Sequence, residues 1–350
     1  NQPQFGDWNA AGVKLYKAMD SLYAVSLPFQ PGTFLEFKAT RGTWATEEKG
    51  MMGLPLEENH GFTTGDEYEH VPFTVEWWAD FGTMPPPQVR TGDIRYHFSV
   101  EPKDKTLKAR DVVVWLPPGY EQDTSRRYPV LYMHDGQNLM DATTAAFSVE
   151  WNVDETADRL VKANEVEPLI IVGIDNTEDR IAEYTPVPFG DKYPDAGRAD
   201  AYGRFLVEEL KPFIDATYRT RTDAASTGLA GSSLGGLVSL YLGLRYPDTF
   251  NRLGVISPSV WWADRDIIDR VEKLQGPLPL RIWEDIGTNE GDGPEAETEA
   301  DARRLYEALR AKGWDDSHLK YTVVPGGRHN EKAWSRRFAD VLRFLYPAVP

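Results

Sequence analysis

The sequence predicts an α/β fold with a doubly wound, mostly parallel sheet, preceded by a small all-β domain. Three observations lead to this prediction. Residues 94–350 alternate apolar runs of strand length with stretches of helical period. Residues 1–83 carry short alternating stretches broken by turn residues, and a proline-rich segment at 84–93 separates the two regions. At 350 residues, the chain is long enough for one large domain and one small one.

The first region is predicted to be an immunoglobulin-like β-sandwich. Leu22–Leu27 and Phe34–Lys38 alternate apolar and polar residues, and the turn residues Pro28, Pro31 and Gly32 lie between them. Short strands with frequent turn signals are typical of antiparallel sandwiches.

This region also resembles a starch-binding-type carbohydrate module. The resemblance rests on Phe5–Asn9, Leu35–Trp44 and Glu47–Gly50. It implies that Trp8 and Trp44 occupy the two positions at which that family stacks tryptophan on glucose rings. The alternative is that both rings fill the core of the sandwich or its contact with the larger domain, which would give the module a structural role.

Residues 84–93 are predicted to be a linker, because the prolines at residues 85–87 stiffen the chain and cannot donate hydrogen bonds to a neighbouring strand. The larger domain follows this linker. Strands are expected at 111–116, 130–134, 169–174, 228–232, 253–256, 280–286 and 319–324. Helices are expected at 201–211 (ended by Pro212), 235–246, 265–274 and 297–312 (followed by Gly313 as a C-terminal cap). Strands that are apolar on both faces indicate a parallel sheet covered by helices on both sides.

The composition excludes several classes of protein. A net charge of −17 argues against binding to nucleic acid or to an anionic membrane surface, because both need an excess of lysine and arginine. No stretch of about 18 uncharged apolar residues exists, so we expect no membrane insertion. The absence of cysteine excludes disulfides, zinc–thiolate sites and cysteine nucleophiles. The oligomeric state is left open.

The chain begins at Asn1 rather than at methionine. We therefore expect a processed or trimmed N-terminus. Separately, we expect a periplasmic or secreted location.

The chemistry is predicted to centre on Gly231–Gly235, a G-x-S-x-G stretch between a predicted strand and a predicted helix. In that setting the central serine is a nucleophile on a sharp, strained turn. Only Ser233 has glycine both two residues before and two residues after it, and we expect both glycines because side chains there would collide with the helix.

A serine nucleophile needs a base, and the chain has six histidines. Only His329 lies downstream of Ser233 on a loop at the carboxyl end of a predicted strand, from which it can reach the serine edge. We expect the Ser233 hydroxyl and the His329 imidazole within or near hydrogen-bond reach.

An acid that orients the base is expected between the two, after a strand. Glu290 follows strand 280–286 through a Gly-Thr turn and is the first choice. Asp285, still within the strand, is the alternative.

Two backbone donors are expected to stabilise the oxyanion. One is the N–H of Leu234, next to the nucleophile. The other is the N–H of Gln137, or alternatively of Gly136, in the glycine-containing loop after strand 130–134. Such a site needs no cofactor and no metal, and we predict neither.

Six motifs in order resemble the enterochelin-esterase and feruloyl-esterase family of α/β-hydrolases. They are Tyr128–Asn138, Ile171–Asn176, Gly231–Gly236, Ser257–Trp262, Gly287–Glu290 and Gly327–Asn330. The resemblance implies an α/β-hydrolase domain over about residues 95–347 and a triad of Ser233, Glu290 and His329. The Ser257–Trp262 stretch resembles the enterochelin side of the family, whereas the carbohydrate-type module resembles the plant-cell-wall side.

Substrate contacts are predicted from residues near these motifs. Trp261, Trp262 and Trp151 are candidates for an aromatic wall around the acyl group, with core packing as the alternative, and Arg180 or Arg328 for holding an anionic part of a substrate. The sequence thus predicts a serine hydrolase of small-molecule or carbohydrate carboxylic esters, working through an acyl-enzyme and favouring bulky or aromatic esters. The alternatives are acyl transfer to a sugar or lipid hydroxyl, or a carbohydrate-binding protein with an inactive hydrolase domain.

Overall fold

The structure is a computed structural model that describes residues 9–348, apart from 20–21, 51–52, 54, 57–58, 76, 82–89 and 292–294. The chain divides into two compact units, residues 1–87 and 88–350. The division falls inside the proline-rich segment. Each unit is described by itself.

The first unit is a small β region, which confirms the predicted all-β character. Its described strands form three two-stranded antiparallel sheets that pair β1 with β2, β3 with β5 and β4 with β6. The strands are β1 Tyr16–Met19, β2 Leu22–Ala24, β3 Phe34–Phe37, β4 Glu48–Lys49, β5 His60–Thr63 and β6 Trp77–Trp78, with 3₁₀ turns η1 Trp44–Thr46 and η3 Ala79–Phe81. Phe37 packs its ring against His60 and Phe73, with centroids 5.2 and 5.1 Å away. The core of this unit therefore rests on a few aromatic rings.

The second unit is built on a mixed sheet, which confirms the predicted fold class. The described strands run in the order β14-β13-β12-β11-β9-β10-β8-β7. The five parallel pairings span β14 to β10, and β8 and β7 are antiparallel at one edge. The strands are β7 Asp93–Val100, β8 Arg110–Leu116, β9 Val130–His134, β10 Ile170–Ile174, β11 Thr227–Ser233, β12 Arg252–Pro258, β13 Arg281–Asn289 and β14 Leu319–Arg328.

The seven predicted strands match β8–β14 to within a few residues, whereas β7 was not predicted. Its half-exposed side chains include Asp93, Arg95 and His97, so it lacks the continuous apolar run of the inner strands.

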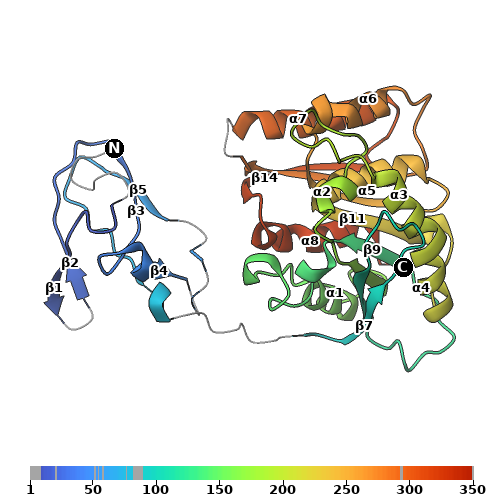
Figure 1. The fold of residues 1–350 in the computed structure, drawn as a ribbon, viewed down its shortest axis with the longest axis horizontal. Helices are drawn as coiled ribbons and strands as arrows, with labels where there is room; N and C mark the ends of the chain where they lie inside the picture. The colour runs from blue at the N-terminus through green and yellow to red at the C-terminus, as the bar shows by residue number, and fades with distance from the viewer. Residues whose placement is uncertain are drawn as a thin grey trace. The chain divides into compact units, whose positions relative to one another are not determined.

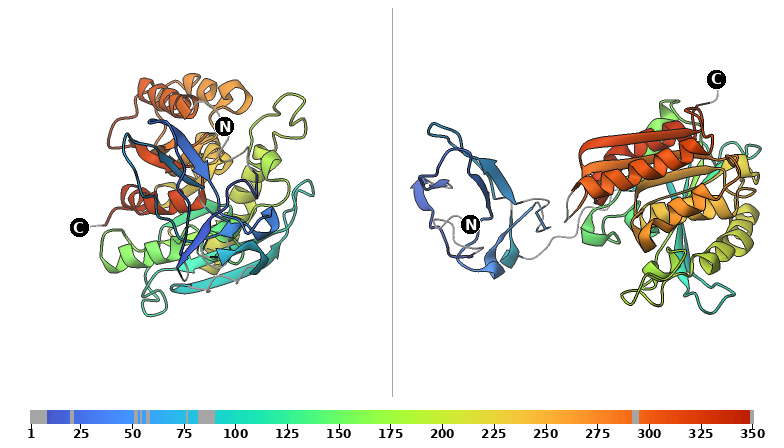
Figure 2. Two further views of the ribbon diagram at one scale, coloured as in Figure 1. Left: turned by 90° about the vertical axis from the view of Figure 1, so that its left-hand side faces the viewer. Right: turned by 90° about the horizontal axis from the view of Figure 1, so that it is seen from above.

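Helices cover both faces of this sheet (Figures 1 and 2). Side chains of α1 Val153–Lys162 and α8 Glu331–Leu345 pack on one face, with Ala230 of β11. Side chains of α3 Ala199–Phe205, α4 Lys211–Thr217, α5 Leu234–Arg245, α6 Asp266–Glu272 and α7 Glu295–Ala311 pack on the other, with Leu229 of β11. Successive residues of β11 therefore enter opposite cores, as the period of a strand requires. A short helix, α2 Arg180–Glu183, follows β10.

One predicted helix end is wrong. Pro212 does not stop helix 201–211, because it lies in the first turn of α4, directly after a π-helical turn over Leu206–Leu210. A proline in the first turn needs no N–H donor and is tolerated there. By contrast, Gly313 follows the end of α7 with φ +107°, as predicted for a capping glycine.

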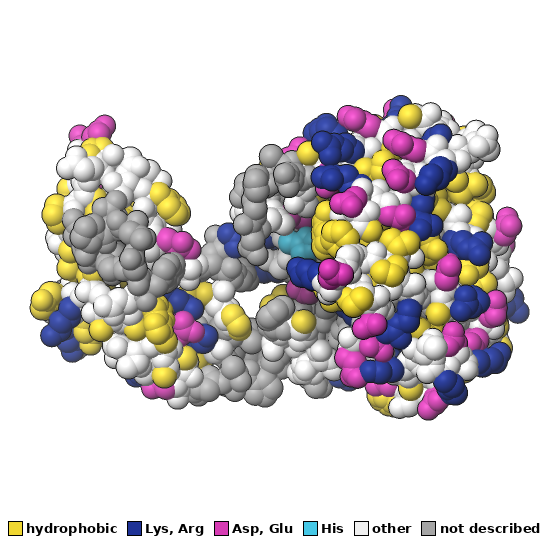
Figure 3. Space-filling view, turned by 45° about the horizontal axis from the view of Figure 1, so that its top comes forward, with side chains coloured by type: hydrophobic (Ala, Val, Ile, Leu, Met, Phe, Trp, Pro, Cys, Tyr) yellow, Lys and Arg dark blue, Asp and Glu magenta, His cyan; other side chains and the backbone are white. Residues whose placement is uncertain are grey.

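The surface of the second unit mixes both signs of charge (Figure 3). On the face shown, lysine and arginine side chains alternate with aspartate and glutamate. Within the part of the chain that the structure describes, no helix has the length and apolar character needed to cross a membrane.

Candidate active site

Ser233 lies on a strained turn at the carboxyl edge of the sheet. It is the last residue of β11, and α5 begins at the next residue, Leu234. Its backbone has φ 58° and ψ −123°, a conformation that costs roughly 1–3 kcal/mol in a residue other than glycine. This strand–turn–helix geometry is the one predicted for the G-x-S-x-G stretch.

The steric need for glycine in this turn is greatest at Gly231 and Gly236. A Cβ on Gly231 would lie 3.0 Å from the backbone of Gly235, and a Cβ on Gly236 would lie 2.9 Å from the carbonyl oxygen of Ile256. The expectation of a collision at Gly235 is wrong, because the nearest atom to a Cβ there is the Cβ of His134 at 3.4 Å, an ordinary contact. The start of α5 therefore lies in close contact with the ends of β11 and β12, at Gly231 and Ile256.

Two neighbouring strands also end in strained backbone. Asp135 follows β9 with φ 59°, and Ser257 lies near the end of β12 with φ 42°. Positive φ values of this kind cluster at functional sites. The strain at three adjacent strand ends marks this edge of the sheet as the candidate site.

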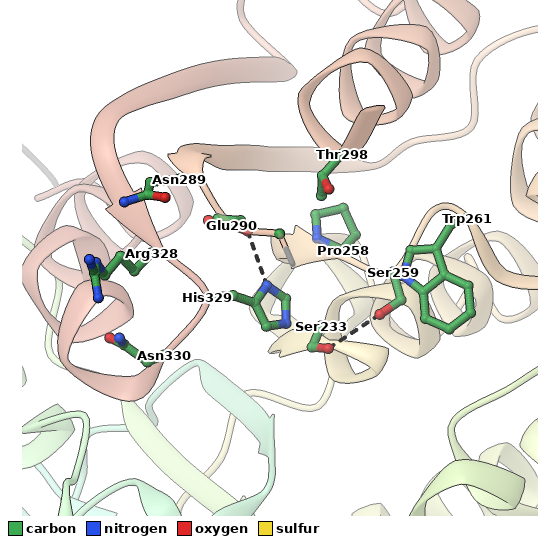
Figure 4. A pocket seen from close by; sticks show the side chains of 11 residues that line it. Ser233, Pro258, Ser259, Trp261, Asn289, Glu290, Thr298, Arg328, His329 and Asn330 are labelled. Carbon is green, nitrogen blue, oxygen red and sulfur yellow. Dashed lines mark hydrogen bonds and ion pairs between the residues drawn. The ribbon is translucent and has the colours of Figure 1, made fainter. Parts of the chain in front are cut away.

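A pocket of about 530 Å³ opens at this edge (Figure 4). Its size is within the range of small-molecule sites. The pocket is lined by Ser233, Pro258, Ser259, Trp261, Asn289, Glu290, Gly291, Thr298, Arg328, His329 and Asn330.

His329 lies between Glu290 and Ser233 in this pocket (Figure 4). It occupies the loop between β14 and α8, and its Nδ1 is 3.1 Å from Oε2 of Glu290. The ring of Trp334 packs edge-on against the imidazole, with centroids 5.0 Å apart. The Nδ1 contact leaves Nε2 for the serine side of the ring, which is the tautomer arrangement that a serine hydrolase needs.

The hydroxyl of Ser233 lies within hydrogen-bond distance of a second serine, Ser259. Its Oγ is 3.2 Å from Oγ of Ser259, which belongs to the loop after β12. Hydrogen bonds between a nucleophile and its base are often long without substrate. The structure thus brings Ser233 and His329 into one pocket and places Oγ of Ser259 within hydrogen-bond distance of Oγ of Ser233.

Glu290 is held by several donors. Its Oε1 accepts hydrogen bonds from the N–H of Gly287 (2.6 Å), the hydroxyl of Ser257 (2.7 Å) and the guanidinium of Arg337 (3.0 Å). Burial acts to raise the pKa of Glu290, but the hydrogen bonds from His329, Ser257 and Arg337 outweigh burial and lower this pKa below its ordinary value. The carboxylate next to the imidazole is therefore kept ionised.

Asp285, the alternative acid, has other partners. It is fully buried within β13, and its two oxygens accept from the guanidinium of Arg337 (2.7 Å) and the indole N–H of Trp283 (2.7 Å). Burial raises its pKa to about 6, against the opposing effect of Arg337. The geometry thus pairs His329 with Glu290 and pairs Asp285 with Arg337.

The loop after β9 carries Gly136 and Gln137 in a 3₁₀ turn, η4 Gly136–Asn138. A Cβ on Gly136 would lie 2.6 Å from the backbone of Gly173 and Ile174, so only glycine lets this loop approach β10. Oε1 of Gln137 accepts from the backbone N–H of Asn176 at 3.2 Å. The loop therefore has a fixed backbone from which an N–H could serve an oxyanion.

Arg180 forms an ion pair with Asp135, the first residue of this loop. Its Nε and Nη2 donate to the two carboxylate oxygens of Asp135 at 2.7 and 2.8 Å, and its guanidinium lies over the ring of Tyr184. It thereby holds the strained residue that precedes Gly136, and it is not among the residues that line the pocket, so the predicted contact with an anionic substrate stays a prediction.

The three candidate tryptophans differ in burial. Trp261 is 45% exposed and lines the pocket, whereas Trp262 and Trp151 are 2% and 3% exposed and do not line it. Trp262 donates its indole N–H to the carbonyl of Val187 at 2.9 Å, and Trp151 packs on Trp334. The alternative weighed for these residues, core packing, is what the structure shows for Trp262 and Trp151.

Of the two tryptophans assigned to sugar binding, Trp8 lies outside the described residues. Trp44 begins η1 and is 44% exposed. Arg328, the other candidate for an anionic substrate, lines the pocket.

The sequence reasoning missed Ser257, Ser259, Trp334 and Arg337. Ser257 and Ser259 belong to a motif already singled out, Ser257–Trp262. Trp334 and Arg337 are on α8, one helical turn apart, and both donate to Ser257 Oγ. The available signal was a charged residue, Arg337, within the apolar stripe of that helix.

Comparisons with known proteins identify the family and fold of this unit. A family model described as "Putative esterase" matches residues 105–345. The uncharacterized protein YbbA of Bacillus subtilis is 27% identical over 244 residues, which is 68% of this chain and 92% of that protein. The ferri-bacillibactin esterase BesA of the same species is 28% identical over 222 residues, 58% of this chain and 73% of BesA. A solved ferulic acid esterase superposes with a TM-score of 0.57 at 20% identity, over 73% of this chain and 98% of that one.

Proposed function

This chain belongs to the esterase family of α/β-hydrolases, and from that premise we propose that it hydrolyses carboxylic esters through an acyl-enzyme at Ser233. One observation supports the proposal above the others. Ser233, on its strained turn, shares a pocket with His329, whose Nδ1 is 3.1 Å from Glu290.

In the first step, Oγ of Ser233 attacks the ester carbonyl carbon and its proton passes to Nε2 of His329. The carbonyl double bond opens to an oxyanion. When it re-forms, the bond to the alcohol oxygen breaks, and the imidazolium returns its proton to the departing alcohol. For the attack, the Ser233 hydroxyl must donate to His329, and its Oγ can at the same time accept from the hydroxyl of Ser259, 3.2 Å away.

In the second step, His329 takes a proton from a water molecule, whose oxygen attacks the acyl carbon. When the carbonyl re-forms, the bond to Oγ of Ser233 breaks, and the imidazolium returns its proton to Ser233 as the acid leaves. Both steps pass through an oxyanion, for which we propose the N–H groups of Leu234 and Gln137 as donors. Glu290 orients the imidazole and stabilises the imidazolium, and Asp285 does not take this part.

For the substrate, we propose an aromatic or otherwise bulky ester. The half-exposed ring of Trp261 offers a flat apolar face inside a pocket that otherwise carries polar groups. The names of the two esterases above point to siderophore and plant-cell-wall esters, so both are candidate substrate classes.

Ser233→Ala tests the proposal. A screen of the wild type over aryl-acyl sugars, acetylated xylan and catecholate trilactones should find an ester that is hydrolysed, and Ser233→Ala should remove essentially all of that hydrolysis with the fold intact. Ser232→Ala is the matched control, since this adjacent serine lacks the flanking glycines, and it should retain most activity. Near-wild-type turnover by Ser233→Ala would refute the proposal.

The same screen separates the alternatives. Release of free acid in water indicates hydrolysis, whereas transfer of the acyl group to an added sugar or lipid hydroxyl would indicate an acyltransferase. Failure with every ester, and failure to acylate Ser233, would favour a binding protein with an inactive hydrolase domain.

The first unit has a second candidate role, favoured by the exposure of Trp44. An indole that is 44% exposed can stack on the apolar face of a glucose ring. Binding isotherms with soluble glucans should show weak saturable binding that Trp44→Ala abolishes while ester hydrolysis is unchanged. No saturable binding by the wild type would leave this unit a structural role. A periplasmic or secreted location stays a prediction, which cell fractionation tests.

A further inference from the structure

Arg337 links two buried carboxylates behind the candidate triad. Its Nη1 donates to Asp285 Oδ1 at 2.7 Å, and its Nη2 donates to Glu290 Oε1 at 3.0 Å. The side chain of Arg337 is 6% exposed and both carboxylates are fully buried. A guanidinium that is paired twice in this way is a fixed bridge, because its planar fork has few alternative orientations.

The bridge fixes one oxygen of Glu290 and leaves the other for the imidazole. Arg337, Ser257 and the N–H of Gly287 all donate to Oε1, whereas Oε2 faces Nδ1 of His329. Ser257 is itself held by the indole N–H of Trp334 at 2.9 Å. Rotation of the Glu290 carboxylate would break all three bonds to Oε1.

Burial raises the pKa of Asp285 to about 6, so above that pH the three buried groups carry a net charge of −1. Arg337 neutralises one carboxylate, and the remaining negative charge is next to His329. If Asp285 were uncharged, Arg337 would neutralise Glu290 alone, and the imidazolium formed during catalysis would lose its counter-charge. A buried charge is stabilised mainly by such fixed partners, since water is excluded.

We propose that Asp285 and Arg337 are positioning residues, which hold Glu290 in place and set the net negative charge that makes His329 an effective base. The proposal rests on the proposed function. Neither residue lines the pocket, so both would act through Glu290.

Other charged groups surround the imidazole and must be counted. Among the residues that the structure describes, the charged groups near the imidazole are Glu290, which contacts it, Glu331, Arg337, which pairs with Glu290, and Arg328, which lines the same pocket. Of these, only Arg337 bonds to Asp285. Substitution of Asp285 therefore changes the charge at His329 without removing a direct neighbour of the ring.

The sign of the expected effect follows from the charge count. Asp285→Asn removes one negative charge, so the imidazolium is less stable and the base loses its proton at a lower pH. The acidic limb of the kcat/KM profile should then move down by about one to two pH units in the range where Asp285 is ionised, for a charge roughly 6–12 Å away at an effective dielectric constant near 20. Arg337→Gln should move the same limb up by a similar amount. In both variants kcat should fall several-fold with KM little changed.

The decisive variant is the double substitution Asp285→Asn/Arg337→Gln, which restores a net charge of −1. Its acidic limb should return to within a few tenths of a pH unit of the wild-type position. It also covers the case in which Arg337→Gln alone fails to fold. The matched control is Glu183→Gln, which breaks the other buried carboxylate–guanidinium pair, with Arg110, away from the pocket and should not move the limb.

The outcomes separate this inference from the proposed function. A wild type without serine-dependent hydrolysis refutes the proposed function before any variant is made. An active wild type whose acidic limb stays in place in Asp285→Asn refutes the inference alone. So does a double variant that keeps the profile of Asp285→Asn.

Discussion

Two adjacent residues of β13, Glu284 and Asp285, are equally buried and have opposite surroundings. Both are 0% exposed, and they point to opposite faces of the sheet because strand side chains alternate. Asp285 meets Arg337 and the indole N–H of Trp283. Glu284 lies opposite Tyr321 of β14, and neither of its oxygens has a hydrogen-bond partner among the described residues.

The contrast shows what burial alone does to a carboxylate. Burial raises the pKa of Glu284 well above its usual value, which favours its protonated form. On the other face, the same burial is opposed by Arg337, and the pKa of Asp285 is raised only to about 6. The donors on one face therefore favour the charged carboxylate that the proposed catalysis needs, whereas Glu284 has no such donor among the described residues.

The largest expected effect separates the two carboxylates near His329. Glu290→Gln should lower kcat by about three to four orders of magnitude, by analogy with other triads, because a glutamine cannot stabilise the imidazolium. Asp285→Asn should lower kcat by no more than about tenfold. The measurement is steady-state hydrolysis of one aryl ester by both variants. Loss of activity in Asp285→Asn with a nearly silent Glu290→Gln would show that the acid is Asp285.

The next effect concerns stability on the opposite face. Glu284→Met should raise the free energy of unfolding at pH 7 by about 1–3 kcal/mol, because it removes a buried polar group whose two oxygens have no hydrogen-bond partner among the described residues. Urea denaturation followed by circular dichroism measures it. Glu284→Gln, which keeps a buried polar group, should gain less.

The pH dependence of this gain gives a further check. The folded-state pKa of Glu284 lies above its unfolded value, so its contribution to stability is complete below about pH 4.5 and is lost as pH rises, at about 1.4 kcal/mol per unit. The advantage of Glu284→Met should therefore grow between pH 5 and 7. A gain that is the same at both pH values would mean that Glu284 is ionised in the fold.

The smallest effect concerns Trp261 and Trp262, two adjacent tryptophans of which the first is half-exposed and the second is buried. Trp261→Ala should reduce the preference for aromatic over acetyl esters by about two- to tenfold, since one stacking contact is lost. Trp262→Ala should instead destabilise the fold by about 3–5 kcal/mol, because its ring is buried, and leave the preference unchanged in enzyme that remains folded. The ratio of specificity constants for a cinnamoyl-type and an acetyl ester decides. Equal ratios in wild type and Trp261→Ala would exclude stacking on Trp261.

Much of the fold could be predicted because its signals are local. The inner strands β8–β13 carry mostly buried apolar runs, and α5 follows a glycine-bounded turn. The edge strand β7 was missed because half of its side chains face water, and the helix through Pro212 was cut short because a π-helical turn has no sequence signature that we used. These failures occur where the surroundings, rather than the residues themselves, decide the conformation.

The residues of the candidate site also divide into those with a local sequence signal and those whose position depends on distant partners. Ser233, Glu290 and His329 could be found from spacing and chain order, because the roles of a triad follow the strand ends of the fold. Arg180 and Trp262 were placed at the substrate, but their partners, Asp135 and the Val187 carbonyl, come from distant segments. Arg337 was missed for the same reason, since its two carboxylates are 47 and 52 residues away along the chain.

Mass spectrometry after treatment with an organophosphonate tests the central assignment most directly, because only an activated serine is labelled. The wild type should carry one phosphonyl group on Ser233. Ser233→Ala should carry none, and His329→Ala and Glu290→Gln should react far more slowly than the wild type. A wild-type protein that hydrolyses esters while Ser233 stays unlabelled, or that is labelled on another residue, would contradict the account.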